Sequence, residues 1–329
     1  MAVDQNLELV FELLEHSVAK AVDDSEQQVV LQEGLPTEVR AFIDPATSRR
    51  GLVVYLDEDQ FDGLKPVSPS QNFGISKLRS EGKPSVRITL FNAEFRKVFY
   101  VFCSEYLREL STSSLAPSTL AVRMYERWKK FFQGKKNDQN QMTDSQQIGL
   151  ICELEVLLAL CQSGVQNASQ FWMGSGRQPH DFQLEDRSLE CKGTTRTNGL
   201  YVEIHGSFNQ LQPLPRKGLE LVVGKYRQDP HGDVSVPKLV SALLSEDSID
   251  QFDLTEKLLE CGYNLDDADA HQGMKSYIRL AAYEFEVTPN FPHLIEQGVK
   301  DRIESVNYTL NLSNPETLEG FKTENDYLR

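Results

Sequence analysis

The stretch that decides the fold runs Pro179-His180-Asp181-Phe182-Gln183-Leu184-Glu185-Asp186-Arg187-Ser188-Leu189-Glu190-Cys191-Lys192. Apolar and polar residues alternate on either side of a polar turn, a pattern that predicts two short strands joined as a hairpin. Successive strand residues point to opposite faces, so Glu190 and Lys192 share one face. Leu189 and Cys191 occupy the other face, which is apolar enough to bury.

The position of Asp181 depends on the length of the hairpin loop. An even-numbered loop places Asp181 on the face of Glu190, whereas a slip of one residue would send it to the opposite face. A four-residue loop over 185–188 satisfies this condition and pairs Phe182 with Cys191. The sequence therefore predicts two carboxylates and one amine on a single face.

Composition places the chain among globular proteins of a reducing compartment. Its 329 residues allow two domains, and 40% hydrophobic and 25% charged content are ordinary. The five cysteines are scattered and form no Cys-x-x-Cys pair, which argues against a structural zinc site. No apolar run has transmembrane length and the first residues lack a basic signal region, so we expect a cytoplasmic protein without membrane contact.

The net charge of −15 is unevenly distributed. Residues 115–227 carry 14 Lys and Arg against 11 Asp and Glu, whereas residues 228–329 carry 8 against 20. An acidic balance limits non-specific binding to DNA but leaves room for a local cationic groove. The commoner interpretation of such asymmetry is a solvated surface.

Hydrophobic periodicity divides the chain into four segments. We predict an N-terminal α+β unit for recognition or partner docking, a basic and aromatic linker helix, an α/β core that contains the hairpin, and an acidic α+β extension packed on that core, at residues 1–112, 113–142, 143–227 and 228–329. In the linker helix, basic residues alternate with Tyr125, Trp128, Phe131 and Phe132. Such a helix suits a phosphate-binding surface, but aromatics in the core and charges in water are the favoured interpretation.

The core is predicted to begin with a helix over 148–160, preceded by a capping box at Thr143 and Gln146. After the hairpin, the pattern predicts a third strand over 200–205, a short helix or loop over 207–214 and a fourth strand over 219–225. Glu153 and Glu155 are the charged residues of this helix and lie about 200° apart around its axis, so both cannot face the same way. Glu153 has apolar neighbours one turn away, and a buried carboxylate without a partner is costly. Either Glu153 reaches a cation or polar cleft, or the helix edge is exposed.

An Asp beside a Glu-x-Lys suits metal-assisted hydrolysis of a phosphodiester. The carboxylates of Asp181 and Glu190 would hold Mg²⁺, with the main-chain carbonyl of Cys191 as a further oxygen donor. The ion would lower the pKa of a bound water, and Lys192 would orient or deprotonate that water and offset charge on phosphate. Glu153 would supply a third carboxylate, directly or through water.

The chain resembles the PD-(D/E)XK nuclease superfamily, with Pro179-His180-Asp181 and Glu190-Cys191-Lys192 as the two halves of its motif. It is more narrowly similar to the bacterial PD-(D/E)XK motif proteins of restriction-like defence gene clusters, through segments that include 149–154, 262–263, 291–292 and 306–308. The resemblance implies an α/β (α+β overall) fold with an αβββαβ core. It also implies Mg²⁺ (or Mn²⁺) dependence, DNA as substrate and an endonuclease activity, with partner proteins of the defence operon or a second copy as partners. By motif, Asp181 and Glu190 would be metal ligands, Lys192 catalytic and Glu153 the helix carboxylate. Two departures are His180 between Pro179 and Asp181, and Cys152 in place of a small glycine.

Three further residues are candidates for substrate contact. Gln210 and Arg196 could bind phosphate or the attacking water, and His180 lies beside Asp181; a loop or capping role explains them equally well. His180, His205 and Cys191 are a weaker alternative as zinc ligands, because Cys191 is predicted to point to the buried face.

Two alternatives to the nuclease stay open. One is a catalytically silent nuclease fold that binds DNA or serves as a scaffold in a defence complex, although such a chain need not keep Asp181, Glu190 and Lys192. The other is an interaction module whose acidic C-terminal part binds a basic partner.

Overall fold

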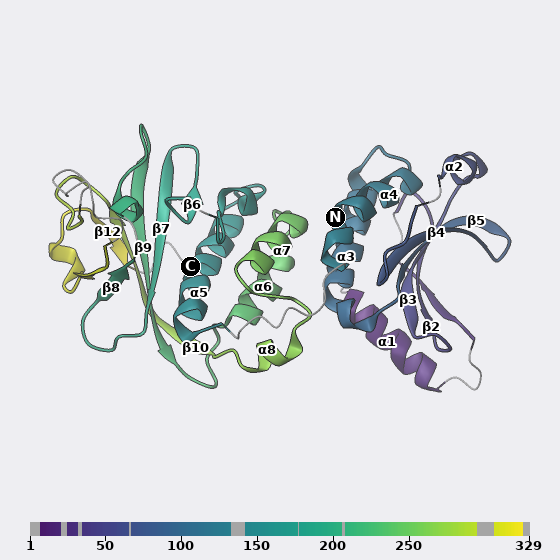
Figure 1. Cartoon of the computed structure of the whole chain (residues 1–329), viewed down its shortest axis with the longest axis horizontal. Coiled ribbons are helices and arrows are strands. Elements are labelled where there is room, and N and C mark those ends of the chain that lie inside the picture. The colour runs from purple at the N-terminus through teal and green to yellow at the C-terminus, as the bar shows by residue number, and fades with distance from the viewer. Residues whose placement is uncertain are drawn as a thin grey trace. The chain divides into compact units, whose positions relative to one another are not determined.

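The computed structural model describes residues 7–20, 25–31, 35–65, 67–132, 142–176, 178–205, 208–294 and 306–324. The chain is mixed α/β and divides into two compact units, residues 1–138 and 139–329, each with its own sheet (Figure 1). Within the described ranges, no helix has both the length and the apolar character needed to cross a membrane.

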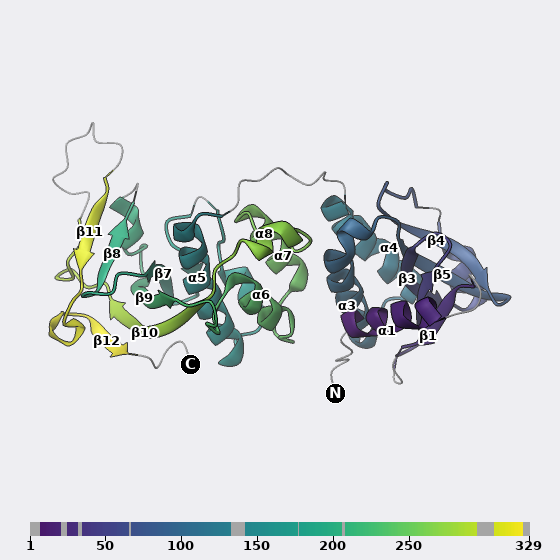
Figure 2. The same ribbon diagram turned by 90° about the horizontal axis from the view of Figure 1, so that it is seen from below.

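The first unit is a five-stranded antiparallel sheet with helices packed on one face. The strand order is β1-β2-β3-β5-β4, and α1, α3 and α4 pack together on the sheet (Figure 2). Its elements are α1 (Leu7–Lys20), β1 (Gln27–Val30), β2 (Val39–Asp44), β3 (Arg49–Tyr55), α2 (Glu58–Gly63), β4 (Phe73–Ser80), β5 (Lys83–Leu90), α3 (Arg96–Thr112) and α4 (Pro117–Trp128).

Helix α4 belongs to the core of this first unit. Tyr125, Trp128 and Phe132 are buried, and Phe73 of β4 stacks against Phe132. The structure thus supports core packing rather than a phosphate-binding face for these aromatics. Lys135 and Lys136, which follow the helix, lie outside the described residues.

The second unit is built on a five-stranded mixed sheet with the order β12-β10-β9-β7-β6. Strands β7 and β9 are parallel and the remaining neighbours are antiparallel. The sheet therefore includes strands β10 and β12 of the segment predicted as a C-terminal extension. The elements are α5 (Asp144–Gln162), β6 (Phe182–Gln183), β7 (Arg187–Thr194), β8 (Tyr201–Ile204), β9 (Gly218–Gln228), α6 (Val236–Leu244), α7 (Gln251–Glu260), α8 (Ala268–Gln272), β10 (Tyr277–Glu286), β11 (Tyr308–Asn311) and β12 (Phe321–Glu324).

Helix α5 begins at the predicted capping box. The hydroxyl of Thr143 accepts the N–H of Gln146 at 3.3 Å, and the side-chain carbonyl of Gln146 accepts the N–H of Thr143 at 2.9 Å. This arrangement satisfies two of the amides that a helix N-terminus leaves unpaired. Because the cap fixes where the helix starts, it also fixes which residues face the sheet.

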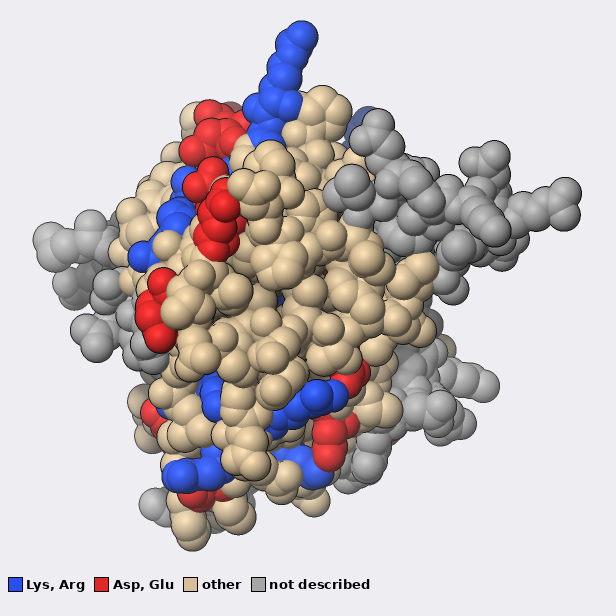
Figure 3. All heavy atoms as spheres, turned by 90° about the vertical axis from the view of Figure 1, so that its left-hand side faces the viewer, with Lys and Arg blue, Asp and Glu red and all other residues tan. Residues whose placement is uncertain are grey.

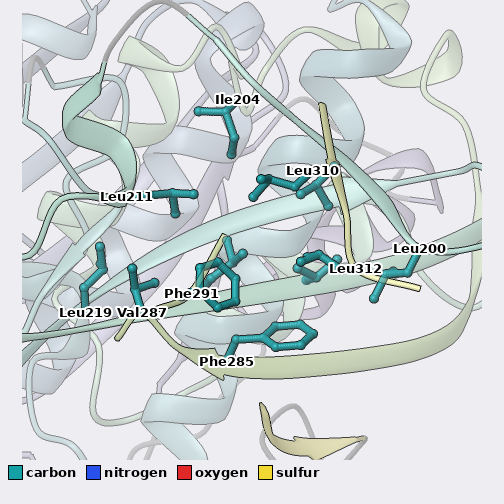
Figure 4. Close-up of a cluster of buried hydrophobic side chains, with 12 residues drawn as sticks. Leu200, Ile204, Leu211, Leu219, Phe285, Val287, Phe291, Leu310 and Leu312 are labelled. Atoms are coloured by element: carbon teal, nitrogen blue, oxygen red, sulfur yellow. The ribbon is translucent and has the colours of Figure 1, made fainter. Parts of the chain in front are cut away.

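Each face of the second sheet has its own apolar layer. Helix α5 covers the face of Cys191 and Gly193, where a Cβ added at Gly193 would lie 2.4 Å from Ile148. On the opposite face, β9 and β10 pack against the two-stranded sheet of β8 and β11 (Figure 4). The buried cluster there is Leu200, Val202, Ile204, Leu211, Leu219, Leu221, Val223, Phe285, Val287, Phe291, Leu310 and Leu312.

The hairpin forms, but its predicted register is wrong by two residues. Phe182 pairs with Leu189 and Gln183 with Ser188, whereas the sequence predicted Phe182 opposite Cys191. A shift of two preserves the alternation of faces, so the predicted face of Asp181 is unaffected. Phe182 also forms an antiparallel bridge to Trp172, outside the hairpin.

The predicted third strand of the core is also placed differently. Strand β8 pairs with β11, with Tyr201 opposite Asn311, and not with the hairpin. The stretch expected as a short helix or loop before β9 contains the 3₁₀ turn Phe208–Leu211. The order of elements along the chain was predicted well, but the pairing of β8 depends on a strand about a hundred residues away.

Candidate active site

One cavity of about 850 Å³ gathers the four residues that the sequence predicts to act together. Glu153 belongs to α5, and Glu190 and Lys192 belong to β7. Asp181 directly precedes β6. Strand β6 pairs with β7 at Ser188 and Leu189. The residues of β7 that follow Leu189 line the cavity.

Asp181 is fixed by main-chain hydrogen bonds. Its Oδ2 accepts the N–H of Cys191 at 2.7 Å, and its carbonyl accepts the N–H of Met173 at 2.8 Å. The first bond takes the place of a strand pairing and holds the carboxylate against β7.

Glu190 and Lys192 form an ion pair on the cavity side of β7. Lys192 Nζ lies 2.6 Å from Glu190 Oε1, and the two side chains are 18% and 3% exposed. Two residues apart on one strand, they share a face as the alternation predicts. The described structure therefore holds the lysine beside a carboxylate rather than in solvent.

Glu153 and Glu155 face opposite sides of α5, as predicted. Glu153 Oε2 accepts the indole N–H of Trp172 at 2.8 Å inside the cavity. Glu155 accepts the hydroxyl of Tyr226 at 2.6 Å and lies 3.3 Å from Arg279. Of the two possibilities open from the sequence, Glu153 therefore reaches a polar cleft. Its partner Trp172 was not predicted; the only available signal was that a buried carboxylate needs a donor.

The cavity disfavours negative charge on its carboxyl groups. Burial and then the charge of Asp181 raise the pKa of Glu153, and the same two causes raise the pKa of Glu190 to about 8, against the opposing effect of Lys192. Burial likewise raises the pKa of Asp181. Burial acts to lower the pKa of Lys192, but Glu190 and Asp181 outweigh it and the pKa is raised. Three carboxyl groups thus lie near one ammonium group in a largely buried site.

The donor set of the cavity fits Mg²⁺, which prefers carboxylate and carbonyl oxygens. Asp181, Glu190 and the Cys191 carbonyl would hold the ion, with Glu153 bound directly or through water. Among the described residues as they stand, no three His, Cys, Asp or Glu side chains are grouped to coordinate one ion. Lys192 contacts Oε1 of Glu190 and the Cys191 amide donates to Oδ2 of Asp181, so each of these contacts uses one of the two oxygens of its carboxylate.

The outer part of the cavity contains two of the three predicted substrate-contact residues. Gln210 lines it with a buried side-chain carbonyl that has no hydrogen-bond partner among the described residues. Arg196 also lines the cavity, and its side chain is half-exposed. Its guanidinium group lies 2.8 Å from the Glu203 carboxylate and over the ring of Tyr201. His180 is 2% exposed and is not among the lining residues.

The zinc alternative finds no support in the described residues. His205 is exposed and pairs with Glu203 at 3.2 Å. Cys191 lies on the strand face covered by α5, although its backbone reaches the cavity. His180 is buried and does not line the cavity that His205 and Cys191 line.

The end of the second unit carries charged residues of both signs. Figure 3 shows the end of the second unit, where Lys and Arg are interspersed with Asp and Glu toward the rim and the centre is uncharged. On the described residues of this face, the basic side chains form no continuous patch.

The fold is mixed α/β, and one cavity brings together three carboxyl groups and a lysine. A family model described as "Putative PD-(D/E)XK family member, (DUF4420)" matches residues 7–313. The chain belongs to this family, which confirms the resemblance seen in its motifs. No curated protein and no solved structure gave a significant match.

Proposed function

We propose that the chain is a Mg²⁺-dependent endonuclease that hydrolyses DNA phosphodiester bonds. The observation that carries the proposal is the grouping of Glu153, Asp181, Glu190 and Lys192 around one cavity. These residues come from three separate elements, and a surface of ordinary solvated charges would not bury three carboxyl groups together.

Each residue has a distinct role in the proposed reaction. Bound Mg²⁺ would polarise the phosphoryl group and lower the pKa of an attacking water. Asp181 and Glu190 would hold the ion, and Glu153 would hold a water or the ion itself. If Glu190 turned toward the ion, Lys192 would be released to orient the water and to offset the charge that develops on phosphate.

In our proposal, the αβββαβ core corresponds to α5, the isolated β-bridge at Trp172, β6, β7, the 3₁₀ turn Phe208–Leu211 in the place of the second helix, and β9. Trp172 pairs antiparallel with Phe182, β6 pairs antiparallel with β7, and β9 runs parallel to β7. Strand β8, predicted as a core strand, is then an insertion that forms the outer wall of the cavity with Tyr201 and His205.

The remaining parts of the proposal rest on the family alone. We propose that the protein acts in the cytoplasm of a bacterial restriction or phage-defence system. The first unit would serve recognition, docking to partner proteins or dimer contacts. In this view the second unit contains the whole catalytic site.

A plasmid assay tests the proposed activity. Purified full-length chain with Mg²⁺ or Mn²⁺ should convert supercoiled plasmid to nicked or linear DNA, and Lys192→Ala should lower the rate by about 10²–10⁴-fold. Lys65→Ala, an exposed lysine of the first unit, is the matched control and should cut as wild type does.

Phage or plasmid restriction in cells covers the case in which partner subunits are needed. If neither assay shows metal-dependent cutting, and Lys192→Ala is indistinguishable from wild type in both, the nuclease proposal is wrong. DNA binding without cutting would then favour the silent scaffold.

A further inference from the structure

Trp172 connects two parts of the cavity that are far apart in the sequence. It follows the 3₁₀ turn Ala168–Phe171 and is fully buried. Its indole N–H donates to Glu153 on α5 at 2.8 Å, and its backbone forms a β-bridge with Phe182 on β6. The next residue, Met173, donates its N–H to the carbonyl of Asp181 at 2.8 Å.

We propose that Trp172 is a positioning residue that sets the Glu153 carboxylate and Asp181 at a fixed separation, so that both can serve one divalent cation. The role rests on the proposed metal-dependent function and deepens it. Nothing in the family motif assigns it, because Trp172 lies outside both motif halves.

The chemistry of the donor matters to this role. An indole N–H is neutral, so it orients Glu153 without supplying the positive charge that Lys192 supplies to Glu190. The bond occupies Oε2 of Glu153; among the described residues, Oε1 accepts no hydrogen bond and is left for a cation or its water. Partners of this kind, which orient the ligands of a metal, typically change metal affinity or activity about 10–100-fold when lost.

The Trp172 segment is itself braced by the neighbouring helix α7. Lys257 Nζ donates to the carbonyl of Ser169 at 2.6 Å, and the N–H of Trp172 donates to the same carbonyl at 3.2 Å. Gly174 follows in the left-handed region (φ +57°), and a Cβ there would lie 3.2 Å from Lys257. Lys257 therefore lies beside the backbone on both sides of Trp172, whose indole N–H donates to Glu153.

Trp172→Phe tests the role, because phenylalanine keeps an aromatic side chain and removes the N–H. We expect the Kd for Mn²⁺, measured by calorimetry on the full chain without DNA, to rise at least 10-fold. The matched control is Trp128→Phe in the first unit, the other tryptophan of the chain and equally buried. Its Kd should stay within twofold of wild type.

A double-mutant cycle separates positioning from general destabilisation. If Trp172 acts through Glu153, then Trp172→Phe in a Glu153→Gln background should weaken Mn²⁺ binding no further than Glu153→Gln alone. The proposal is overturned if the two substitutions weaken Mn²⁺ binding independently, so that their fold-losses in affinity multiply in the double variant. It is also overturned if Trp172→Phe folds and binds Mn²⁺ with unchanged affinity. Thermal unfolding of each variant shows whether it is folded.

A third measurement needs no substitution at Trp172. In Trp128→Phe protein, Trp172 is the sole tryptophan, and paramagnetic Mn²⁺ in the cavity should quench its fluorescence with the Kd found by calorimetry. Saturable Mn²⁺ binding without quenching contradicts the role of Trp172 but leaves the nuclease proposal standing. A wild-type chain that binds no Mn²⁺ and cuts no DNA removes the proposed function, and the role of Trp172 with it.

Discussion

Replacing Glu190 with glutamine should stabilise the metal-free protein at alkaline pH. Burial and the charge of Asp181 raise the pKa of Glu190 to about 8, from an ordinary value of 4.5. An acid with a raised pKa stays protonated in the folded protein while the unfolded chain ionises. The free energy of unfolding therefore falls as pH rises from about 4.5 to about 8 and is constant above that.

The size of the effect follows from the gap between the two pKa values. At 1.36 kcal/mol per pKa unit, the carboxyl group costs the wild-type protein on the order of 3 kcal/mol of stability between pH 5 and pH 8. Glutamine has nearly the same shape and does not ionise, so the variant lacks this loss. Near pH 5, where Glu190 of the folded protein is protonated, the two proteins should differ little.

Urea unfolding in EDTA at several pH values measures the difference. A Trp128→Phe background leaves Trp172 as the reporter, so the fluorescence follows the second unit. Glu316→Gln, an exposed carboxylate, is the matched control and should track the wild type at every pH. Parallel curves for Glu190→Gln and wild type from pH 5 to pH 8 would refute the argument that burial of this carboxylate is costly.

Three further predictions concern other contacts. Tyr226→Phe removes the hydroxyl that donates to the buried Glu155 carboxylate at 2.6 Å, and should lower the free energy of unfolding of the second unit by about 1–3 kcal/mol in urea titrations. Gly51→Ala would place a Cβ 1.8 Å from the carbonyl oxygen of Ile88 on the paired strand, and should destabilise the first unit by about 3 kcal/mol or prevent its folding, as seen by circular dichroism; an unchanged unit would contradict the register of β3 and β5. The cavity carries an excess of acidic over basic side chains, so Ca²⁺ should raise DNA affinity at least about tenfold over EDTA in fluorescence anisotropy, and Asp181→Asn should remove most of that gain; equal affinity with and without Ca²⁺ would show that the phosphates bind elsewhere.

Local alternation was enough to predict which residues meet on the hairpin. Glu190 and Lys192 share a face whatever the register, and a shift of two residues leaves Asp181 on that face. The helical period likewise separated Glu153 from Glu155, which face different partners. Such predictions hold because they depend on the geometry of one element and not on its neighbours.

Long-range contacts were beyond the sequence. The hairpin register occurs together with the Trp172 bridge and the bond from the Cys191 amide to Asp181, and neither contact has a periodic signal in the sequence. Strand β8 resembles a continuation of the hairpin, but it pairs with β11 because its apolar face closes the cluster around Phe285. Trp172 was missed for the same reason, since its partner is a helix residue 19 positions earlier.

The most direct test of the central claim is a crystal structure of the full chain soaked in Mn²⁺, with anomalous data collected at the manganese edge. We predict one strong peak in the cavity, about 2.2 Å from oxygens of Asp181, Glu190 and the Cys191 carbonyl. Glu190 should have moved away from Lys192. An empty cavity with Glu190 still paired to Lys192, and manganese bound elsewhere or not at all, would contradict the account.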